Sequence, residues 1–215
     1  MSADNYNSIQ TQALGEYKEK GSKFIAYAIP FISIDNLKEE IEILKKAHPK
    51  ARHWCYAYRI GKDGKVFRSN DDGEPSGSAG KPILGQLLSK DISDVLVVVV
   101  RYFGGTKLGV PGLIHAYKTS AADALDNAAI IEKTLSSKFL LTASYAEMGR
   151  VMEIIKKLDV TLDSKNFEED IKLYFSVPKS QIESRIRSIK AAFLSRPVAD
   201  VLWDEKIDAC TIIEI

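Results

Sequence analysis

The chain has 215 residues, of which 45% are hydrophobic and 27% are charged, and its formal net charge is +1. This composition is typical of a globular protein with one large domain or two smaller ones, and it excludes a global basic field for nucleic acid. Cys55 and Cys210 form no CxxC pair, and neither an apolar leader nor a run of 18 apolar residues is present. We therefore expect a cytoplasmic protein with free thiols, no metal and no membrane association.

The first half of the chain predicts one mixed-sheet domain. Aromatic and β-branched runs, one of them the aliphatic stretch before Arg101, predict strands at 24–34, 52–60, 65–69 and 95–102. Apolar periodicity predicts helices at 35–48, 82–89 and 110–127. Leu37, Ile41 and Leu44 fall on one face of the first helix.

The second half has the order β-α-β-β-α-β, which is that of a ferredoxin-like unit. Strands are expected at 137–143, 160–167, 170–177 and within 198–215, and helices at 145–158 and 179–193. Met148, Met152 and Ile155 are expected on one face of the first of these helices. A linker over 129–136 would divide the chain into an α+β domain at 1–133 and a second one at 134–215.

Two glycine-rich turns carry the strongest functional signal. Their glycines are Gly73, Gly77 and Gly80 in the first turn and Gly104, Gly105 and Gly109 in the second. Glycines clustered beside a buried strand indicate positive φ or close approach by another molecule. The second turn opens onto a predicted helix, whose free N–H groups could hold an anion. Alternatively, the glycines only shape two tight connections.

Several motifs in this region resemble the Impact family, whose bacterial members are the YigZ-like proteins. They are GEYKEKGSKFIAYA (15–28), ARHWCYAYRI (51–60), GEPSGSAGKPIL (73–84), VVVVRYFGGTKLG (97–109) and PGLIHAY (111–117). The last motif departs from the family pattern, which usually has glycine near Pro111, arginine at His115 and a small residue at Lys118. The resemblance covers about the first 125 residues.

The resemblance implies a fold and a function. The first domain is expected to resemble ribosomal protein S5 domain 2 and elongation factor G domain IV, and the second elongation factor G domain V. It implies a non-catalytic protein, without a cofactor, that acts on translation by binding ribosomal RNA, the ribosome or a translation factor. A protein-interaction adaptor and a small-molecule enzyme, including a phosphotransferase, remain as alternatives.

Candidate RNA contacts occur along the predicted hairpin. Its basic residues are Arg52, Arg59, Lys62, Lys65 and Arg68, and aromatic residues lie between them. Basic and exposed aromatic side chains together suit phosphate pairing and base stacking. Because alternate strand residues share a face, Trp54, Tyr56 and Tyr58 lie together, and they could equally form a core cluster beneath a solvated rim.

A second set of candidates lies at the glycine-rich turns. It consists of Glu74, Lys81, Arg101, Lys107, His115 and Lys118. Arg101 ends a buried strand, where a guanidinium needs a carboxylate or a phosphate, and Glu74 is the candidate carboxylate. Convergence of these side chains would make an anion pocket at the start of the helix 110–127.

The enzyme alternative has weaker sequence support. The PSGSAGKP segment lacks the Walker spacing, and VVVVRYFGG lacks the GxGxxG spacing of a dinucleotide site. Ser76 or Ser78 could be a nucleophile with His53 or His115 as its base, but no GxSxG elbow is present. His53 and Cys55 share a strand face and fit a core pair better than two metal ligands.

Overall fold

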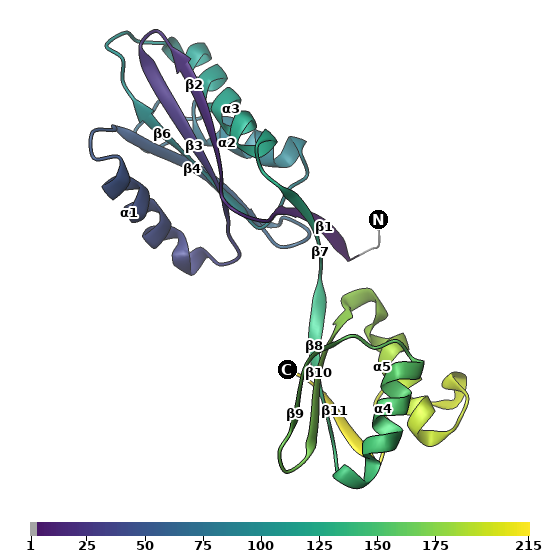
Figure 1. Ribbon diagram of the computed structural model, residues 1–215. Coiled ribbons are helices and arrows are strands. Elements are labelled where there is room, and N and C mark those ends of the chain that lie inside the picture. Colours follow the sequence, from purple (N-terminus) through teal and green to yellow (C-terminus); the bar gives the residue numbers. More distant parts are fainter. Residues whose placement is uncertain (1–3) are drawn as a thin grey trace. The chain divides into compact units, whose positions relative to one another are not determined.

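The computed structural model describes residues 4–215, which form two compact units (Figure 1). The N-terminal unit is Asn5–Lys133, and the C-terminal unit is Thr134–Ile215 together with Asp4. Each unit has its own sheet and its own hydrophobic core. The chain is thus a two-unit protein built from both helices and strands.

The N-terminal unit is built on a five-stranded sheet. In chain order its strands are β2 (Ala13–Glu19), β3 (Ser22–Pro30), β4 (His53–Ile60), β5 (Val66–Asn70) and β6 (Val95–Tyr102). The order across the sheet is β2-β3-β6-β4-β5, and all four pairings are antiparallel. The expectation of a mixed sheet is therefore wrong for this unit.

Helices cover both faces of this sheet. The single-turn η1 (Ile34–Asn36) leads into α1 (Leu37–Ala47) on one face, and α2 (Gly80–Ser89) and α3 (Gly109–Asp126) lie on the other (Figure 1). Leu44 is buried, with Leu37 and Ile41 packed beside it, as the predicted apolar face requires. Because β6 is covered on both sides, every residue from Val95 to Val100 is fully buried, which explains its unbroken aliphatic sequence.

Strand β4 divides its side chains between the two faces. Trp54, Tyr56 and Tyr58 pack with α1, whereas Cys55 and Ala57 lie in the core under α2 and α3. Tyr58 is buried in this cluster, and Trp54 and Tyr56 are partly buried against it, so the packing favours the core-cluster alternative for these three rings. Phe67 on β5 is 58% exposed.

Three short strands are absent from the sequence-based expectation. They are β2 and the two-stranded pair of β1 (Asn5–Ile9) with β7 (Ile130–Thr134). Strand β2 is an edge strand with several polar, exposed residues, so its hydrophobic pattern is weak. Residues 130–134 form β7, which lies within the segment 129–136 where the domain boundary was expected.

The C-terminal unit shows the element order β-α-β-β-α-β. Its strands are β8 (Ser136–Ala143), β9 (Leu162–Phe167), β10 (Ile171–Pro178) and β11 (Cys210–Glu214), and its helices are α4 (Met148–Lys157) and α5 (Ile182–Leu194). Single turns occur at Tyr145–Glu147, Lys179–Gln181 and Val198–Asp200. The sheet order is β11-β8-β10-β9, with antiparallel pairing throughout.

Both helices of this unit pack on one face of its sheet. Val151, Ile154 and Ile155 of α4 are buried, whereas Met152 is 36% exposed. Met152 lies outside the buried face, because α4 turns its Val151 and Ile154 side toward the sheet. In α5 the expected stripe is present, with Ile186, Ile189 and Phe193 buried. No helix in the described part of the chain is long and apolar enough to cross a membrane.

Candidate anion-binding cleft

The two glycine-rich turns meet at one cleft of the N-terminal unit. The cleft has a volume of about 410 Å³, and both turns contribute to its wall, as do the start of β4 and the end of β6. Its charged and aromatic lining residues are Arg52, His53, Glu74, Arg101, Phe103 and Lys107. Leu108, Gly109 and Val110 line the cleft as well, so α3 begins at its wall.

The glycines of the two turns serve two structural needs. Four of them have a positive φ: +83° at Gly73, +75° at Gly77, +90° at Gly105 and +74° at Gly109. Such values disfavour any side chain. At Gly104 a Cβ atom would lie 1.9 Å from the carbonyl carbon of Gly21, and at Gly80 it would lie 2.6 Å from the backbone nitrogen of Asn70. The close approach here is made by the protein's own backbone.

The cleft is anchored by a buried ion pair. Arg101 Nη1 donates to Glu74 Oε1 over 2.5 Å, and the side chains are only 7% and 4% exposed. The Arg101 guanidinium also lies over the rings of Phe24 and Phe103, 5.4 and 5.5 Å from their centroids. Of the two partners considered for Arg101, the structure gives it the carboxylate. Its Nε is buried without a hydrogen-bond partner among the described residues.

A tyrosine inside α3 completes the Glu74 site. The Tyr117 hydroxyl donates to the same Glu74 oxygen over 2.8 Å, and Tyr117 is fully buried. Burial is the largest cause that raises the pKa of Tyr117 far above its usual range, and the neighbouring Cys55 and Glu74 raise this pKa further. The phenol therefore stays protonated and remains a hydrogen-bond donor to the carboxylate.

Next to Tyr117 lies the thiol of Cys55. Its sulfur is 3.2 Å from the Tyr117 hydroxyl and 3.0 Å from the carbonyl oxygen of Asp71. Burial is the main cause that raises the pKa of Cys55 well above that of a free thiol. The protonated form is a poor nucleophile and a poor metal ligand, so Cys55 belongs to the scaffold.

Asp71 holds the first glycine-rich turn in place. Its carboxylate accepts hydrogen bonds from the backbone N–H groups of Gly77, Ala79 and Gly80 over 2.8, 3.0 and 2.8 Å. Burial opposes its ionisation, but these backbone bonds and Lys81 outweigh it, so the pKa of Asp71 is lowered. The start of α2 thus already has an anion of its own.

The start of α3 is different. Its N-cap residue, Leu108, makes no side-chain hydrogen bond to the helix, and its first turn contains no acidic residue. The first N–H groups of an 18-residue helix therefore have no side-chain cap, and the helix dipole favours an anion at that position. Of the two helix starts beside the glycine-rich turns, only that of α3 is open to a ligand.

The structure separates the remaining predicted site residues from the cleft. Lys81 and Lys118 are exposed elsewhere, and the His115 ring packs edge-on against Tyr17 at 5.4 Å between centroids. Arg59 Nη1 is bound to Asp91 over 2.9 Å, and Lys65 lies 3.1 Å from Asp63. Lys62 lies at the hairpin turn, and Arg68 is exposed on β5.

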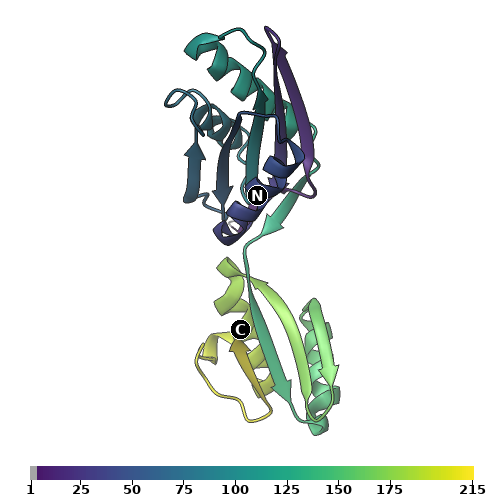
Figure 2. The ribbon, with the colours of Figure 1, turned by 90° about the vertical axis from the view of Figure 1, so that its left-hand side faces the viewer.

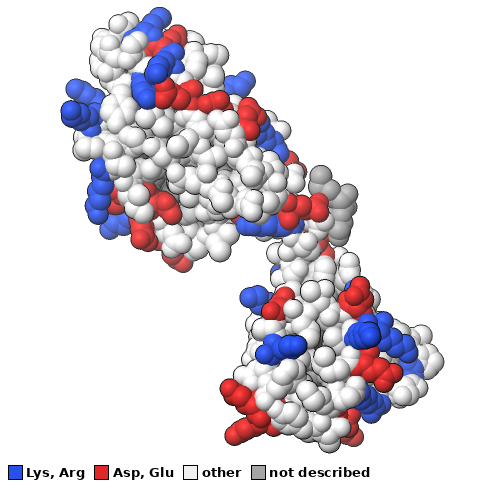
Figure 3. Space-filling model, viewed as in Figure 1, with Lys and Arg blue, Asp and Glu red and all other residues white. Residues whose placement is uncertain are grey.

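The predicted basic hairpin is consequently not one patch. Arg52 precedes β4, and Lys62 follows it, so about 25 Å of extended strand separates the two ends. On the face of the molecule in Figure 3, basic and acidic residues are interleaved. Only Arg52 of the five hairpin candidates joins Arg101 and Lys107 at the cleft.

Several residues of the site were not singled out as candidates from the sequence. Tyr117, Asp71 and Phe103 fall into this group. One signal was available for Tyr117, because a tyrosine among the small residues of a buried helix face needs a partner for its hydroxyl. Asp71 could have been noted as an acidic residue shortly before a predicted helix.

The serines do not form a nucleophile pair with a histidine. Ser78 is buried, and its Oγ donates to the carbonyl oxygen of Pro75 over 2.6 Å. His53 Nδ1 instead lies 2.8 Å from the carbonyl oxygen of Asp72, and its Nε2 lies 3.9 Å from Glu74. Within residues 4–215 no hydrogen bond joins Ser76 or Ser78 to a histidine.

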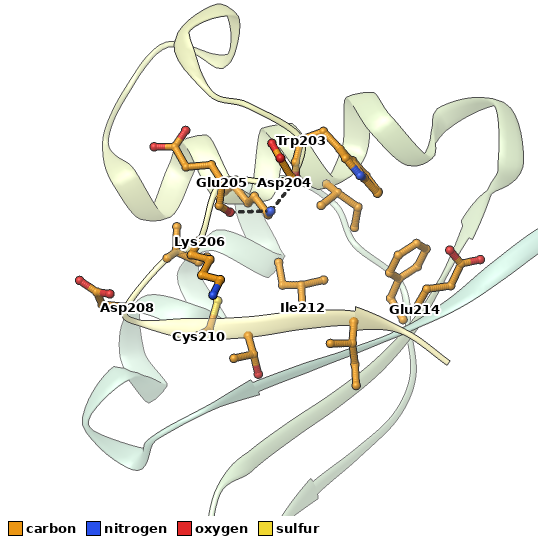
Figure 4. Close-up of a pocket in the computed structure, with 14 residues that line it drawn as sticks. Trp203, Asp204, Glu205, Lys206, Asp208, Cys210, Ile212 and Glu214 are labelled. Carbon is orange, nitrogen blue, oxygen red and sulfur yellow. Dashed lines mark hydrogen bonds between the residues drawn. The ribbon is translucent and has the colours of Figure 1, made fainter.

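A second hollow, of about 520 Å³, lies beside β11 in the C-terminal unit (Figure 4). Lys190 is part of its wall, and its Nζ donates to the backbone carbonyls of Trp203 and Glu205 over 2.6 Å each. Its acidic lining residues are Asp204, Glu205, Asp208 and Glu214, against the two lysines Lys190 and Lys206. This hollow is larger than the cleft, but its charge has the wrong sign for a phosphate ligand.

Comparison with known proteins identifies the family. The Impact N-terminal domain profile matches residues 20–125. The chain is 33% identical over 167 residues to IMPACT family member YvyE of Bacillus subtilis, with 78% of this chain and 77% of that protein covered. The chain belongs to the Impact family. It is also 30% identical to IMPACT family member YigZ of Escherichia coli, over 87% of this chain and 92% of that one.

Relatives in eukaryotes and solved structures also match this Impact family chain. Protein IMPACT of Rattus norvegicus is 36% identical over 102 residues, which cover 45% of this chain and 32% of that protein. A crystal structure of a hypothetical protein superposes with a TM-score of 0.67 at 25% identity, covering 99% and 98% of the two chains. The structure of the two-domain translational regulator Yih1 superposes with a TM-score of 0.37 at 26% identity, covering 55% of this chain and 48% of that chain.

Proposed function

We propose that this Impact family protein acts on translation as a binding protein, and that its cleft holds phosphate groups of ribosomal or other structured RNA. The observation that carries the proposal is the convergence of three basic side chains on an uncapped helix start. Arg52, Arg101 and Lys107 come from separate segments and line the cleft with one carboxylate, Glu74. Such an arrangement provides a local positive potential although the whole chain is nearly neutral.

The three basic residues have different parts in this proposal. Arg101 is committed to Glu74 and fixes the floor of the cleft. Arg52 and Lys107 are exposed and make no ion pair among the described residues, so they are the phosphate contacts. In this proposal the buried Glu74–Arg101 pair keeps the cleft in place, and the exposed cations at its rim bind the phosphate through charge-assisted hydrogen bonds.

The finer fold assignment is part of the same proposal. We propose that the N-terminal unit is like ribosomal protein S5 domain 2 and elongation factor G domain IV. The C-terminal unit is proposed to be ferredoxin-like, as is elongation factor G domain V. Its element order and its sheet order β11-β8-β10-β9 support this assignment.

The test compares two double variants of the full chain. Arg52→Gln/Lys107→Gln removes the rim cations, and the control Lys62→Gln/Lys65→Gln removes two lysines at the far end of β4. Sedimentation of each protein with ribosomes through sucrose gradients at several salt concentrations gives the affinity and its salt dependence. The slope of log K against log salt should fall by about 1.4–1.8 for the cleft variant, because each lost phosphate contact contributes about 0.7–0.9.

Two results would contradict the proposal. If the control variant loses binding while the cleft variant keeps it, the hairpin turn is the site. If the unmodified protein fails to sediment with ribosomes even at low salt, the ribosome is not its partner. A translation factor or a small phosphate compound would then be the remaining occupant of the cleft.

A further inference from the structure

One face of the C-terminal sheet is open. Alternate residues of β8 and β10, such as Phe139, Leu141, Leu173 and Phe175, point into the core beneath α4 and α5. The residues between them point to the opposite side, which no helix of the described C-terminal unit covers (Figures 1 and 2). This open face is formed by Lys138, Leu140, Thr142, Ser164, Asn166, Lys172, Tyr174, Ser176, Thr211 and Ile213.

The centre of the open face is apolar and aromatic. The strand register places Tyr174 opposite Leu140, and Leu140 opposite Ile213, so the three side chains form one row across three neighbouring strands. A solvated sheet face normally carries polar residues at such positions. Ile213 is 53% exposed. The row is about 10 Å long, given the spacing of adjacent strands, and it offers a flat surface with one aromatic ring.

Lysines flank the row on both sides. Lys138 precedes Leu140 by two residues and lies opposite Ser176, whereas Lys172 precedes Tyr174 by two and lies opposite Thr142. Because the strands are antiparallel, the two lysines lie on opposite sides of the row, each about 7 Å away along its strand. Both are exposed, and neither has an ion-pair partner among the described residues. A nearby carboxylate, Asp163, accepts a hydrogen bond from Ser176 Oγ over 2.6 Å.

We infer that the open face binds single-stranded RNA. Tyr174 would stack on a base, the neighbouring Leu140 and Ile213 would support the next base, and Lys138 and Lys172 would contact phosphates on either side. Open four-stranded sheets with aromatic side chains on their central strands bind unpaired bases in this way. The charge of the flanking residues favours a polyanion over an apolar protein surface. The inference shares its class of ligand with the proposed function but uses a different unit of the chain.

The experiment measures binding of the full chain to a fluorescein-labelled 12-nucleotide oligouridine by fluorescence anisotropy at several salt concentrations. Tyr174→Leu keeps an apolar side chain but removes the ring, and we expect it to weaken binding about 5- to 150-fold, which is the effect of one stacked base. Lys138→Gln and Lys172→Gln should each reduce the salt slope by about 0.7. Lys156→Gln, on the exposed side of α4, is the matched control and should bind as the unmodified protein does.

The variants of the cleft separate this inference from the proposed function. If Tyr174→Leu loses oligouridine while Arg52→Gln/Lys107→Gln retains it, the open face binds RNA whatever the cleft binds. If only the cleft variant loses it, or if the unmodified protein does not bind oligouridine at low salt, the inference is wrong. Concentration-dependent dimerisation that Tyr174→Leu abolishes, seen by analytical ultracentrifugation without RNA binding, would overturn it in favour of a protein contact.

Discussion

Replacing Arg101 by methionine tests whether the Glu74–Arg101 pair holds the cleft together. The two side chains are 7% and 4% exposed and joined over 2.5 Å, so the substitution leaves a buried carboxylate without its cation. Removing one partner of a buried ion pair costs about 3–5 kcal/mol, and the lost contacts with the Phe24 and Phe103 rings add to that cost. This is a large part of the 5–15 kcal/mol that typically stabilises a folded domain.

The free energy of unfolding, measured by urea denaturation of the ligand-free protein, checks this value. Arg68→Met is the matched control, because Arg68 is exposed on β5, and it should change stability by less than about 0.5 kcal/mol. The double variant Glu74→Gln/Arg101→Met should recover at least about 1 kcal/mol relative to Arg101→Met, since a neutral amide can still accept from Tyr117 at a lower desolvation cost.

The reasoning is refuted if Arg101→Met costs less than about 1 kcal/mol, or if the Glu74 and Arg101 substitutions are additive. Either result would mean that the pair is not coupled in solution. Arg101 would then be free to serve as a phosphate contact with Arg52 and Lys107. A large loss of stability instead assigns Arg101 to the scaffold and leaves binding to the two rim residues.

Two further predictions concern the glycine-rich turns. Asp71→Ala leaves three backbone N–H groups without their acceptor and should lower the free energy of unfolding by about 1–2 kcal/mol at pH 7. Folding lowers the pKa of the Asp71 carboxyl from its ordinary value of 3.8. The stabilisation by the Asp71 carboxylate is therefore complete above pH 3.8 and is lost as the pH falls through the lowered pKa. Urea denaturation at pH 7 and pH 3 should therefore show a smaller difference between the two proteins at pH 3, and an equal difference would contradict the ionic role of Asp71. Gly104→Ala should destabilise the N-terminal unit, since its Cβ would lie 1.9 Å from the Gly21 backbone, whereas Gly85→Ala, which meets nothing within 4 Å, should be neutral or stabilising by the same measurement.

The family and most of the helices and strands were predictable from the sequence alone, which also singled out the two glycine-rich turns. These features depend on local properties. Periodicity reports which face of an element is apolar, and glycine reports backbone that a side chain would disturb. The polar edge strand β2 and the short strands β1 and β7 could not be predicted from the local hydrophobic pattern, because their stability comes from partners distant in sequence.

Which charged residues lie close together could not be predicted without the tertiary structure. The pairing of β4 with β6 brings Arg52 beside Arg101, whose carbonyl accepts from the Arg52 backbone N–H, and leaves Lys62 beyond the other end of β4. Arg52 and Lys62 nevertheless belong to the same predicted hairpin. The packing of α3 on the sheet brings Tyr117 to Glu74, 43 residues away in sequence. Electrostatic and hydrogen-bond energies depend on distance and burial in three dimensions, and these are fixed by the packing of whole elements rather than by the composition of any one of them.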